Sequence, residues 1–380
     1  MVYLRTGQGR KHMQKNSDQR KAIRLHFTNV AGLGAVRLLQ SLLPSMINQR
    51  NYRIEAAYIP IRGELSNYVQ FEQGTMLIPY KRYLPNSISR LLECTLFGSK
   101  FNGKTPLLIF GDIPIRGKSK QTVFVQTPLL TGEAGKDRKL GAIKYLIARW
   151  LFRRNIRYAS DFIVQTEAMK SALIDSYPEI KNRIHIIPQP PPNWLIRSEI
   201  KRTKFINPSD SGMQLFYPAA FYPHKNHRIL KKINRSLSWP VSELILTIPN
   251  NLNPNPSIPW IHCLDRLEPD AILNYYRTSD ALLFLSLSES LGFPLVEAMW
   301  IGLPIICPDL PYARILCGEE AIYFDPQNVD SLNAAIVDLN QRRQSGWWPD
   351  WSKNLEKIPH GWPEVADEIL ELAAGEKMLD

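Results

Sequence analysis

Short apolar runs, bounded by polar and turn-forming residues, recur along the whole chain. In the first half they lie at Ile23–Thr28, Arg53–Ile59, Pro106–Phe110, Thr122–Val125, Asp161–Val164 and Arg183–Ile187. Runs of this length predict buried β-strands, and segments with helical periodicity separate several of them. Strands that alternate with helices favour a parallel sheet covered by helices.

The second half repeats this alternation. Strands are predicted at Gln214–Pro218, Glu243–Ile248, Trp260–Leu264, Ala281–Leu285 and Pro304–Cys307. Helices are predicted from about Asn226 and at Glu268–Tyr276, Pro294–Trp300 and Trp362–Ala373. Both halves therefore read as doubly wound α/β units, and ligands of such sheets bind at the carboxyl ends of the strands, here in the cleft between domains.

A proline-rich, polar stretch at residues 188–212 interrupts the pattern near the middle of the chain. Segments of this composition are typical of linkers between domains. We expect an N-terminal domain at residues 1–190, a C-terminal domain at 191–358 and a final helical segment at 359–380.

Length and composition narrow the class of protein. A chain of 380 residues with 44% apolar and 22% charged residues is typical of a soluble two-domain protein and excludes collagen-like or coiled-coil architectures. No run reaches the roughly 18 to 20 apolar residues of a spanning helix, and residues 1–20 lack an apolar secretion signal. These features predict a cytoplasmic protein.

The unpaired spacing of Cys94, Cys263, Cys307 and Cys317 predicts reduced thiols, with neither a disulfide framework nor a zinc site.

The positive charge belongs to the first half. Residues 1–190 contain 30 Lys and Arg against 12 Asp and Glu, whereas the remaining residues contain 17 against 23. This asymmetry indicates an anionic partner near the first half, and a nucleic acid, a phospholipid surface and a diphosphate-bearing substrate all satisfy it.

An early glycine pair follows the first predicted strand. Gly32 and Gly34 stand where this strand turns into a helix that runs through Met46. Glycines let a backbone approach a ligand closely, and the start of a helix offers free N–H groups to an anion. The pair lacks the third glycine of a dinucleotide-binding motif, so a plain tight turn and a ligand loop both fit.

The most informative segment joins a buried strand to a helix at residues 286–299. Glu289 lies in the loop, Glu297 lies about one turn inside the helix, and Gly292 lies between them. Backbone N–H groups near Gly292 can face a phosphate, and the two carboxylates can accept hydrogen bonds from sugar hydroxyls. This layout suits a sugar nucleotide. The alternative is that both acids only stabilise the positive end of the helix.

A second loop, residues 221–227, also follows a strand and places Lys225 at the same rim as Glu289. A cation there could neutralise a departing diphosphate, and the alternative is a solvated lysine. His224, His227 and His262 lie on different loops, so no metal site is predicted.

The segment Glu289 to Glu297 resembles the E-x7-E motif of the retaining GT-B glycosyltransferases, the family 4-like group that includes sucrose-synthase-like and mannosyltransferase-like enzymes. The likeness covers most of the chain. It includes Gly32-x-Gly34, Ala159–Glu167, Pro223–His227, Ser279–Pro304 and Tyr323–Pro326. The final helix resembles the segment with which the family crosses back onto the N-terminal domain.

The resemblance implies a GT-B fold and a hexosyltransferase that moves a sugar from a UDP- or GDP-linked donor to a glycan or lipid-linked acceptor, in polysaccharide or glycolipid synthesis. It implies that Glu289 contacts the transferred sugar, Glu297 the ribose and Lys225 the diphosphate. The implied donor contacts further include Gly32, Gly34, Arg266, Leu267, Ser290, Leu291, Gly292 and Phe293. No cofactor and no metal are expected, which agrees with the lack of a D-x-D triplet.

Two positions depart from the family pattern. Ala220 stands where many relatives carry an arginine, so another basic residue would share the phosphate charge with Lys225. Gln126 stands where many carry a histidine, and an amide can hydrogen-bond a sugar but cannot exchange a proton. Gln126 is therefore a candidate for positioning. We expect transfer with retention, in which the leaving diphosphate helps to accept the proton of the acceptor.

Residues 136–158 form a basic amphipathic pattern in which arginines and lysines alternate with Leu140, Ile143, Ile147, Trp150 and Leu151. Such a helix suits the surface of an anionic bilayer and predicts peripheral association with the inner face of the membrane. The alternative is a helix that packs on the sheet with a solvated face.

Two rival functions remain, a nucleic-acid-binding protein and an inactive transferase-like assembly partner. The chain has no recognisable nucleic-acid-binding motif, so no nucleic acid is expected.

Overall fold

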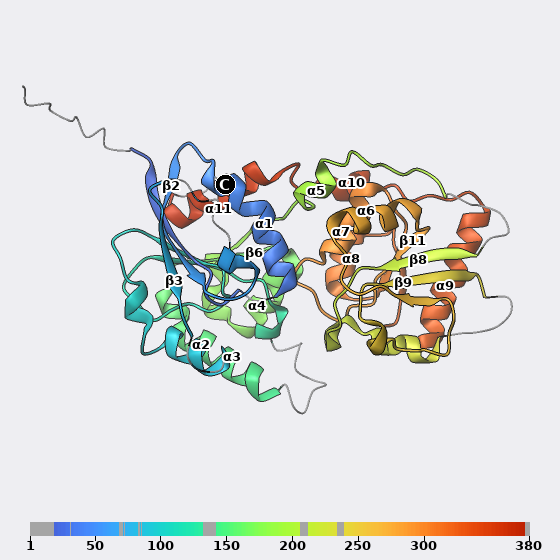
Figure 1. Ribbon diagram of the computed structural model, residues 1–380, viewed down its shortest axis with the longest axis horizontal. Coiled ribbons are helices and arrows are strands. Elements are labelled where there is room, and N and C mark those ends of the chain that lie inside the picture. The colour runs from blue at the N-terminus through green and yellow to red at the C-terminus, as the bar shows by residue number, and fades with distance from the viewer. Residues whose placement is uncertain are drawn as a thin grey trace, which may run out of the picture.

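The computed structural model describes residues 19–30, 32–67, 71, 73–82, 84, 86–131, 142–205, 212–233 and 239–376. These residues form two α/β domains side by side along the long axis of the molecule (Figure 1). The N-terminal domain is built on a parallel sheet of seven strands in the order β3-β2-β1-β4-β5-β6-β7, and the C-terminal domain on a parallel sheet of six strands in the order β10-β9-β8-β11-β12-β13. This is the predicted pair of doubly wound sheets.

The strands agree closely with the predicted apolar runs. Those of the N-terminal sheet are β1 (Lys21–His26), β2 (Tyr52–Pro60), β3 (Met76–Tyr80), β4 (Leu107–Ile109), β5 (Gln121–Phe124), β6 (Asp161–Val164) and β7 (Ile184–Ile186). Those of the C-terminal sheet are β8 (Met213–Tyr217), β9 (Val241–Leu246), β10 (Ile261–Cys263), β11 (Ala281–Leu283), β12 (Ile305–Pro308) and β13 (Ile322–Phe324). The sequence prediction omitted the edge strands β3 and β13.

Helices and short 3₁₀ turns connect the strands. The N-terminal domain contains α1 (Leu33–Ile47), η1 (Glu64–Asn67), α2 (Asn86–Cys94), η2 (Gly98–Phe101), η3 (Pro128–Leu130), α3 (Ala142–Asn155), η5 (Ile156–Tyr158), α4 (Glu167–Ser176) and η6 (Pro178–Arg183). After it come α5 (Asn193–Ile196), η7 (Pro223–Lys225), η8 (His227–Lys232), η9 (Asn250–Leu252), α6 (Pro269–Thr278), α7 (Phe293–Ile301), α8 (Pro311–Cys317), α9 (Val329–Gln344), α10 (Ser352–Leu355) and α11 (Trp362–Ala374). Among all the residues described here, no helix combines the length and the apolar character that crossing a bilayer would require.

Continuous apolar runs arise because both faces of the N-terminal sheet are buried. In β4, Leu108 packs in the core beneath α1 and α11, whereas Leu107 and Ile109 pack in the opposite core beneath α3 and α4. Alternating side chains therefore serve different cores, as the two-residue period of a strand requires.

The predicted helix from about Asn226 is wrong. The structure has two short 3₁₀ turns there, η7 and η8, with Asn226 between them at a left-handed φ of 54°. Asparagine tolerates that conformation better than other non-glycine residues, so the chain turns where a regular helix would have to continue. The amide of Asn226 donates to the carbonyl of Pro326 at 3.2 Å, which stabilises the turn.

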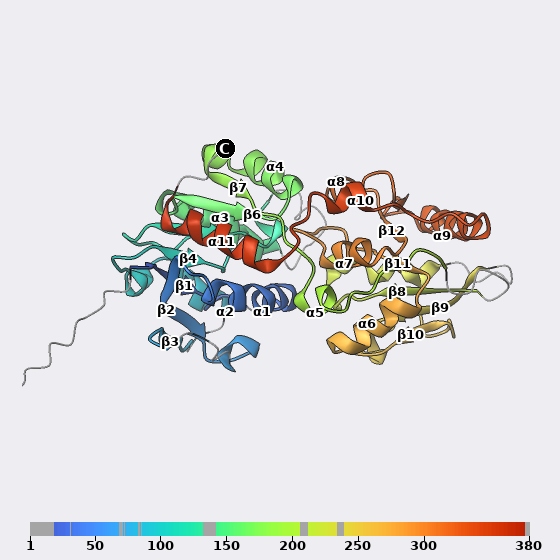
Figure 2. The ribbon, with the colours of Figure 1, turned by 90° about the horizontal axis from the view of Figure 1, so that it is seen from above.

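The C-terminal helix α11 leaves the C-terminal domain and lies against the N-terminal one. Figure 2 shows it across the N-terminal domain, near α1, and its residues from Trp362 to Ala373 share a core with α1 and β1. The indole N–H of the fully buried Trp362 donates to the carbonyl of Pro191 at 2.9 Å. The predicted domain limits, 190/191 and 358/359, stay predictions.

We expect Trp362→Ala to lower the free energy of unfolding by about 3–5 kcal/mol, because it removes a large buried side chain and leaves a cavity. Trp362→Phe keeps a smaller aromatic ring and loses the hydrogen bond to Pro191, for a smaller loss of about 1–3 kcal/mol. Urea unfolding followed by circular dichroism measures both. Trp150→Ala, at an exposed tryptophan, serves as the control. Equal effects of the three substitutions would contradict the packing role of α11.

Candidate active site

A cavity of about 1460 Å³ lies between the domains and is lined by loops from both. These loops follow the carboxyl ends of the strands in the two sheets. The carboxyl ends of both sheets point towards the same gap. All residues predicted for catalysis or donor binding line it, namely Gly32, Gly34, Gln126, Lys225, Arg266, Leu267, Glu289, Ser290, Leu291, Gly292, Phe293 and Glu297. The roles of these residues stay predictions, but the structure brings them to one place.

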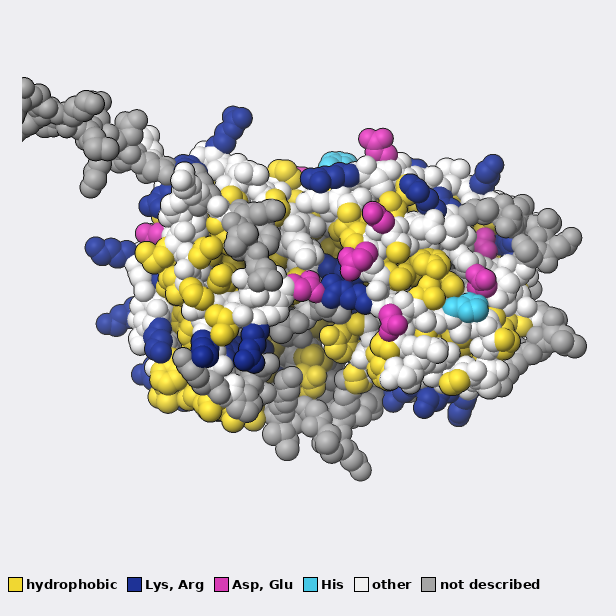
Figure 3. Space-filling model, in the orientation of Figure 1, with side chains coloured by type: hydrophobic (Ala, Val, Ile, Leu, Met, Phe, Trp, Pro, Cys, Tyr) yellow, Lys and Arg dark blue, Asp and Glu magenta, His cyan; other side chains and the backbone are white. Residues whose placement is uncertain are grey.

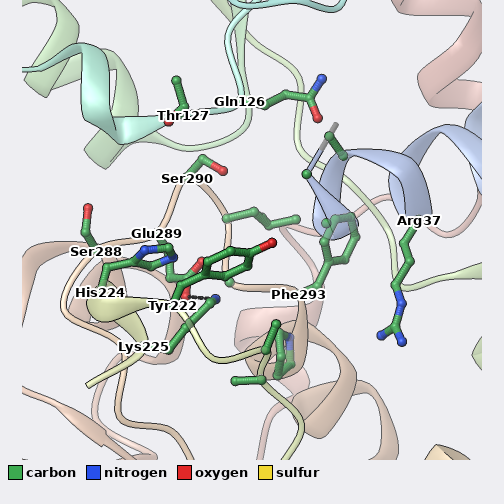
Figure 4. A pocket seen from close by; sticks show the side chains of 18 of the residues that line it. Arg37, Gln126, Thr127, Tyr222, His224, Lys225, Ser288, Glu289, Ser290 and Phe293 are labelled. Carbon is green, nitrogen blue, oxygen red and sulfur yellow. Dashed lines mark hydrogen bonds and ion pairs between the residues drawn. The ribbon is translucent and has the colours of Figure 1, made fainter. Parts of the chain in front are cut away.

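Lys225 and Glu289 form an ion pair within the cavity (Figure 4). Lys225 ends η7, after β8, and Glu289 lies in the loop after β11. Two hydrogen bonds hold the backbone around Lys225. The hydroxyl of Tyr217 donates to the carbonyl of Lys225 at 2.8 Å, and the backbone N–H of Leu287 donates to the carbonyl of His224 at 2.7 Å. A ligand that binds Lys225 must therefore compete with a carboxylate already in contact with it.

Gly292 occupies a position that only glycine adopts readily. Its φ of 81° is left-handed, and it immediately precedes α7, whose first residues are Phe293 and Pro294. A Cβ atom at Gly292 would stand 3.3 Å from Cδ1 of Leu295. The glycine lets the loop carrying Glu289 turn directly into the helix, with the helix N-terminus facing the cavity.

Glu297 is buried in the wall of the cavity. The hydroxyl of Tyr276 donates to its Oε2 at 2.6 Å. Burial raises the pKa of the Glu297 carboxyl, and the hydrogen bond from Tyr276 and the charge of Arg37 oppose that shift. Arg37 lies on α1 in the N-terminal domain, so residues of both domains affect the pKa of Glu297.

Gln126 lies across the cavity from the loop of Glu289, at the end of β5 (Figure 4). Its backbone N–H donates to Oδ1 of Asp112 at 2.7 Å, and its side-chain amide donates to the carbonyl of Phe110 at 3.3 Å. Burial raises the pKa of Asp112, whereas Arg90, 3.8 Å from Asp112 Oδ2, opposes this shift. Gln126 is thus fixed in place, as a positioning residue requires.

The early glycines line the cavity without left-handed backbone conformations. Gly32 precedes α1 with an extended backbone, and Gly34 lies in the first turn of α1. A Cβ atom at either glycine would meet nothing within 4 Å. The local turn therefore does not require glycine, and the interpretation as a ligand loop stays a prediction.

Two contacts join the domains at the cavity rim. Arg266, which also lines the cavity, pairs with Glu64 of the N-terminal domain through Nη1 and Oε1 at 2.6 Å. The hydroxyl of Thr166 donates to the carbonyl of Ser290 at 2.9 Å. The contact from Thr166 therefore holds the loop that carries Glu289 from the opposite side of the cleft.

The histidines do not assemble a metal site. His224 and His227 line the cavity and His262 does not. Burial, reinforced by the charge of Lys225, lowers the pKa of His227 to about 4, so this ring is neutral near neutral pH. Among the described residues, no group of three or more His, Cys, Asp or Glu side chains is arranged to hold a metal ion. Of the four free cysteines, three are buried and Cys263 is half-buried.

Sequence reasoning missed several residues that line the cavity. They are Arg37, Arg90, Asp112, Thr127, Tyr145 and Arg228. Arg37 lies three residues after Gly34, on the same helix, and Asp112 follows β4 as Gln126 follows β5. The carboxyl end of each predicted strand was thus the available signal, and it indicated Asp112 as clearly as Gln126.

Comparison with known proteins agrees with this geometry. The family model "Glycosyl transferases group 1" matches residues 260–345, which include the Glu289–Glu297 segment. The serotype-specific mannosyltransferase WbdA of Escherichia coli is 26% identical over 136 residues, 34% of this chain and 16% of that protein. The O-antigen chain mannosyltransferase RfbU of Salmonella typhimurium is 20% identical over 210 residues, 52% of this chain and 56% of that protein. The chain thus covers less than two thirds of either relative.

Among solved structures, the chain resembles WaaG, a glycosyltransferase involved in lipopolysaccharide biosynthesis. The TM-score is 0.62 at 14% identity, and the match covers 93% of this chain and all of the other. The fold is therefore GT-B, as predicted. The family match agrees with the predicted resemblance to the glycosyltransferase family 4-like group over residues 260–345.

We expect Glu297→Gln to change how stability depends on pH. A carboxyl whose pKa is raised by folding stabilises the native state below its ordinary value of 4.5, and this contribution is lost as the pH rises towards the native pKa. Glutamine keeps an acceptor for Tyr276 and does not titrate. The melting temperature of Glu297→Gln should therefore rise relative to wild type from pH 4.5 to neutrality.

Thermal unfolding across this pH range measures the difference. Glu356→Gln, at an exposed glutamate of the same part of the chain, is the control and should follow wild type. If Glu297→Gln also followed wild type at each pH, the raised pKa would be refuted.

Proposed function

We propose that this protein is a retaining hexosyltransferase that moves a sugar from a nucleotide diphosphate to a glycan or lipid-linked acceptor. The observation that carries the proposal is the pairing of Lys225 with Glu289 beside the N-terminus of α7, with buried Glu297 one turn further along that helix. A cation, backbone N–H groups and two carboxylates then face one cavity, as a sugar nucleotide requires.

Each group has a separate role in the proposal. Lys225 binds the diphosphate, Glu289 the transferred sugar and Glu297 the ribose, with Arg266 and Leu267 near the base. The amides around Gly292 and Phe293 contact the phosphates and the sugar, together with Ser290, Leu291, Gly32 and Gly34. When the donor arrives, its phosphates replace Glu289 as the partner of Lys225, which frees the carboxylate to accept hydrogen bonds from sugar hydroxyls.

Arg37 supplies the second positive charge in the absence of an arginine at position 220. Its influence on the pKa of Glu297 supports this assignment, because the arginine acts on that acid from the opposite domain. Lys225, Arg266 and Arg90 each lie within ion-pairing distance of a carboxylate, whereas no ion pair of Arg37 is found among the described residues. A guanidinium without a fixed partner can bind phosphate at lower cost.

In the reaction, the bond between the anomeric carbon and the diphosphate oxygen breaks, and an acceptor oxygen attacks the same face of the sugar. The acceptor proton passes to an oxygen of the leaving diphosphate. Lys225 and Arg37 stabilise the negative charge that develops on this group, a contribution that is usually large. Gln126 orients the sugar or the acceptor by hydrogen bonding. The reaction requires neither a metal nor a cofactor.

The acceptor belongs to cell-surface polysaccharide or glycolipid synthesis, with the protein peripheral to the inner face of the membrane through residues 136–158. The relatives WbdA and RfbU are mannosyltransferases by name, which makes mannose the first sugar to test.

A panel of UDP- and GDP-linked hexoses tests the function directly. We expect one nucleotide sugar to raise the melting temperature and to be consumed with EDTA present, because the ligand binds the native state and no metal is needed. In the product, NMR should find the anomeric configuration of the donor. If only an oligonucleotide stabilised the protein, the result would favour a nucleic-acid-binding protein. If a nucleotide sugar bound but was not consumed, the result would favour an inactive transferase-like partner. A product with inverted anomeric configuration would refute transfer with retention.

Lys225→Ala and Glu289→Ala should each lower kcat about a hundredfold or more, as the loss of one preorganised electrostatic group does. Arg37→Gln should raise the KM for the donor more than it lowers kcat. Lys231→Ala, at an exposed lysine of η8, is the matched control and should retain wild-type rates. Wild-type turnover in both Lys225→Ala and Glu289→Ala would refute the assigned roles.

A further inference from the structure

We propose that the accepting hydroxyl belongs to a sugar ring, and that this ring stacks on Phe221 and Tyr222 at the interdomain cavity. These two residues are here called the aromatic platform. The proposal rests on the proposed function and narrows it, because it selects a saccharide acceptor over a lipid alcohol or a lipid phosphate. It also gives a binding role to two residues that the donor site does not use.

The aromatic platform stands out by its exposure. Phe221 and Tyr222 are 48% and 44% exposed, and both line the cavity. Among the described residues of the C-terminal domain, the other exposed large apolar side chains are Ile315 and Val337, and neither lines the cavity. Adjacent apolar side chains that stay in contact with water at a cavity mark a place where a ligand binds.

Each ring of the platform is supported by a histidine. The rings of Tyr222 and His224 are stacked, 6° from parallel with their centres 5.6 Å apart. The ring of Phe221 lies 5.5 Å from that of the buried His227. The backbone N–H of Lys225 donates to the carbonyl of Tyr222 at 2.9 Å, which closes η7. The platform is therefore formed before a ligand arrives, and binding requires little further ordering of these side chains.

Sugar rings have a chemical reason to pack on such side chains. One face of a pyranose carries C–H groups whose hydrogens bear a small positive charge, whereas the face of an aromatic ring is negative. The hydroxyls around the sugar ring then remain available for hydrogen bonds with polar groups. A saccharide site therefore combines an aromatic surface with hydrogen-bonding groups that surround it.

The polar groups of such a site lie on the other side of the cavity. Figure 4 shows Gln126 and Thr127 across from Tyr222. Asp112, in the same wall, has a left-handed φ of 65°, and its Oδ1 accepts from the N–H of Gln126 at 2.7 Å. A carboxylate has about four positions that can accept hydrogen bonds, so Asp112 can also bind sugar hydroxyls. We assign Asp112 to the orientation of the acceptor.

The same wall disfavours the other acceptors. The carboxylate of Asp112 repels a phosphate, because like charges raise the free energy of the complex. The chain of a lipid alcohol has no hydroxyls along its length, so it would leave Gln126 and Thr127 without partners in a cavity that excludes water. A sugar ring satisfies both walls.

A nucleobase is the other ligand that can stack on aromatic rings. Tyr222 lies three residues before Lys225, which the proposed function places at the diphosphate. In the same assignment the ribose lies at Glu297, between the diphosphate and the base. The base is therefore separated from the aromatic platform by the rest of the nucleotide.

Apolar and charged side chains both reach the surface at the junction of the domains. On the face shown in Figure 3, hydrophobic side chains lie there beside acidic and basic ones. On the N-terminal side, Tyr145 of α3 adds a further aromatic residue to the lining of the cavity. It belongs to residues 136–158, of which 136–141 lie outside the described part of the chain. An acceptor with more than one sugar ring thus has a second aromatic contact available.

Binding of free oligosaccharides to the full chain tests the platform without the reaction. The probes are disaccharides and trisaccharides of mannose, glucose, galactose and N-acetylglucosamine. In saturation-transfer NMR we expect at least one probe to receive saturation at its ring C–H protons. Phe221→Ala with Tyr222→Ala should weaken this binding on the order of tenfold. Tyr222→Phe keeps the stacking ring and should restore most of the binding that Tyr222→Ala loses.

Transfer kinetics test whether the platform serves the acceptor. With the donor that the nucleotide-sugar panel identifies, Tyr222→Ala should raise the KM for the saccharide acceptor on the order of tenfold and leave the KM for the donor in place. Asp112→Asn keeps an oxygen for the N–H of Gln126 and should raise the same KM. Phe97→Ala, at an exposed phenylalanine outside the cavity lining, is the control and should retain wild-type rates. Unchanged melting temperatures show that the variants fold.

The platform and the proposed function fail in different ways. If oligosaccharides bind through the platform and no nucleotide sugar is consumed, transfer is refuted and the platform remains a saccharide site. The platform is overturned if no probe binds, or if transfer proceeds with an unchanged acceptor KM in Phe221→Ala and Tyr222→Ala. A rise in the donor KM alone would assign the rings to the donor instead. Turnover with a lipid alcohol or a lipid phosphate, and with none of the saccharides, would contradict a sugar acceptor.

Discussion

The arrangement of the site depends on one constraint: two parallel sheets point their carboxyl ends at the same gap. Each parallel strand ends at that edge, and the following loop must begin there. Gln126 follows β5, Lys225 follows β8 and Glu289 follows β11, so residues far apart in sequence meet without long excursions of the chain. The geometry of the backbone thus places these side chains at the gap between the domains, and their chemistry determines what the gap can bind.

Local sequence signals predicted the parts of this arrangement that local physics controls. The loop around Glu289 was recognisable because a glycine able to adopt positive φ stands before a proline suited to the first turn of a helix, and the structure has Gly292 and Pro294 in those positions. The strands were recognisable because burial on two faces demands unbroken apolar runs. The error at Asn226 has a local cause too, since its left-handed backbone interrupts a stretch with acceptable helical periodicity.

Other features depend on contacts that sequence spacing does not encode. Arg266 meets Glu64 across 202 positions of sequence, and nothing near either residue indicates the other. Arg37 reaches the environment of Glu297 only after both domains have folded and met. Gln126 and Asp112 follow consecutive strands that pair in the sheet, but their hydrogen bond depends on the left-handed backbone of Asp112, which the sequence does not show. The fold was therefore more predictable than the internal contacts of the site.

The hydrogen bond between Trp362 and Pro191 has a mechanical consequence. The chain passes between the domains once near Pro191 and again before Trp362, and this bond fastens the two passages to each other. Because the two passages are tied to each other, a rotation of one domain against the other would have to move both of them together.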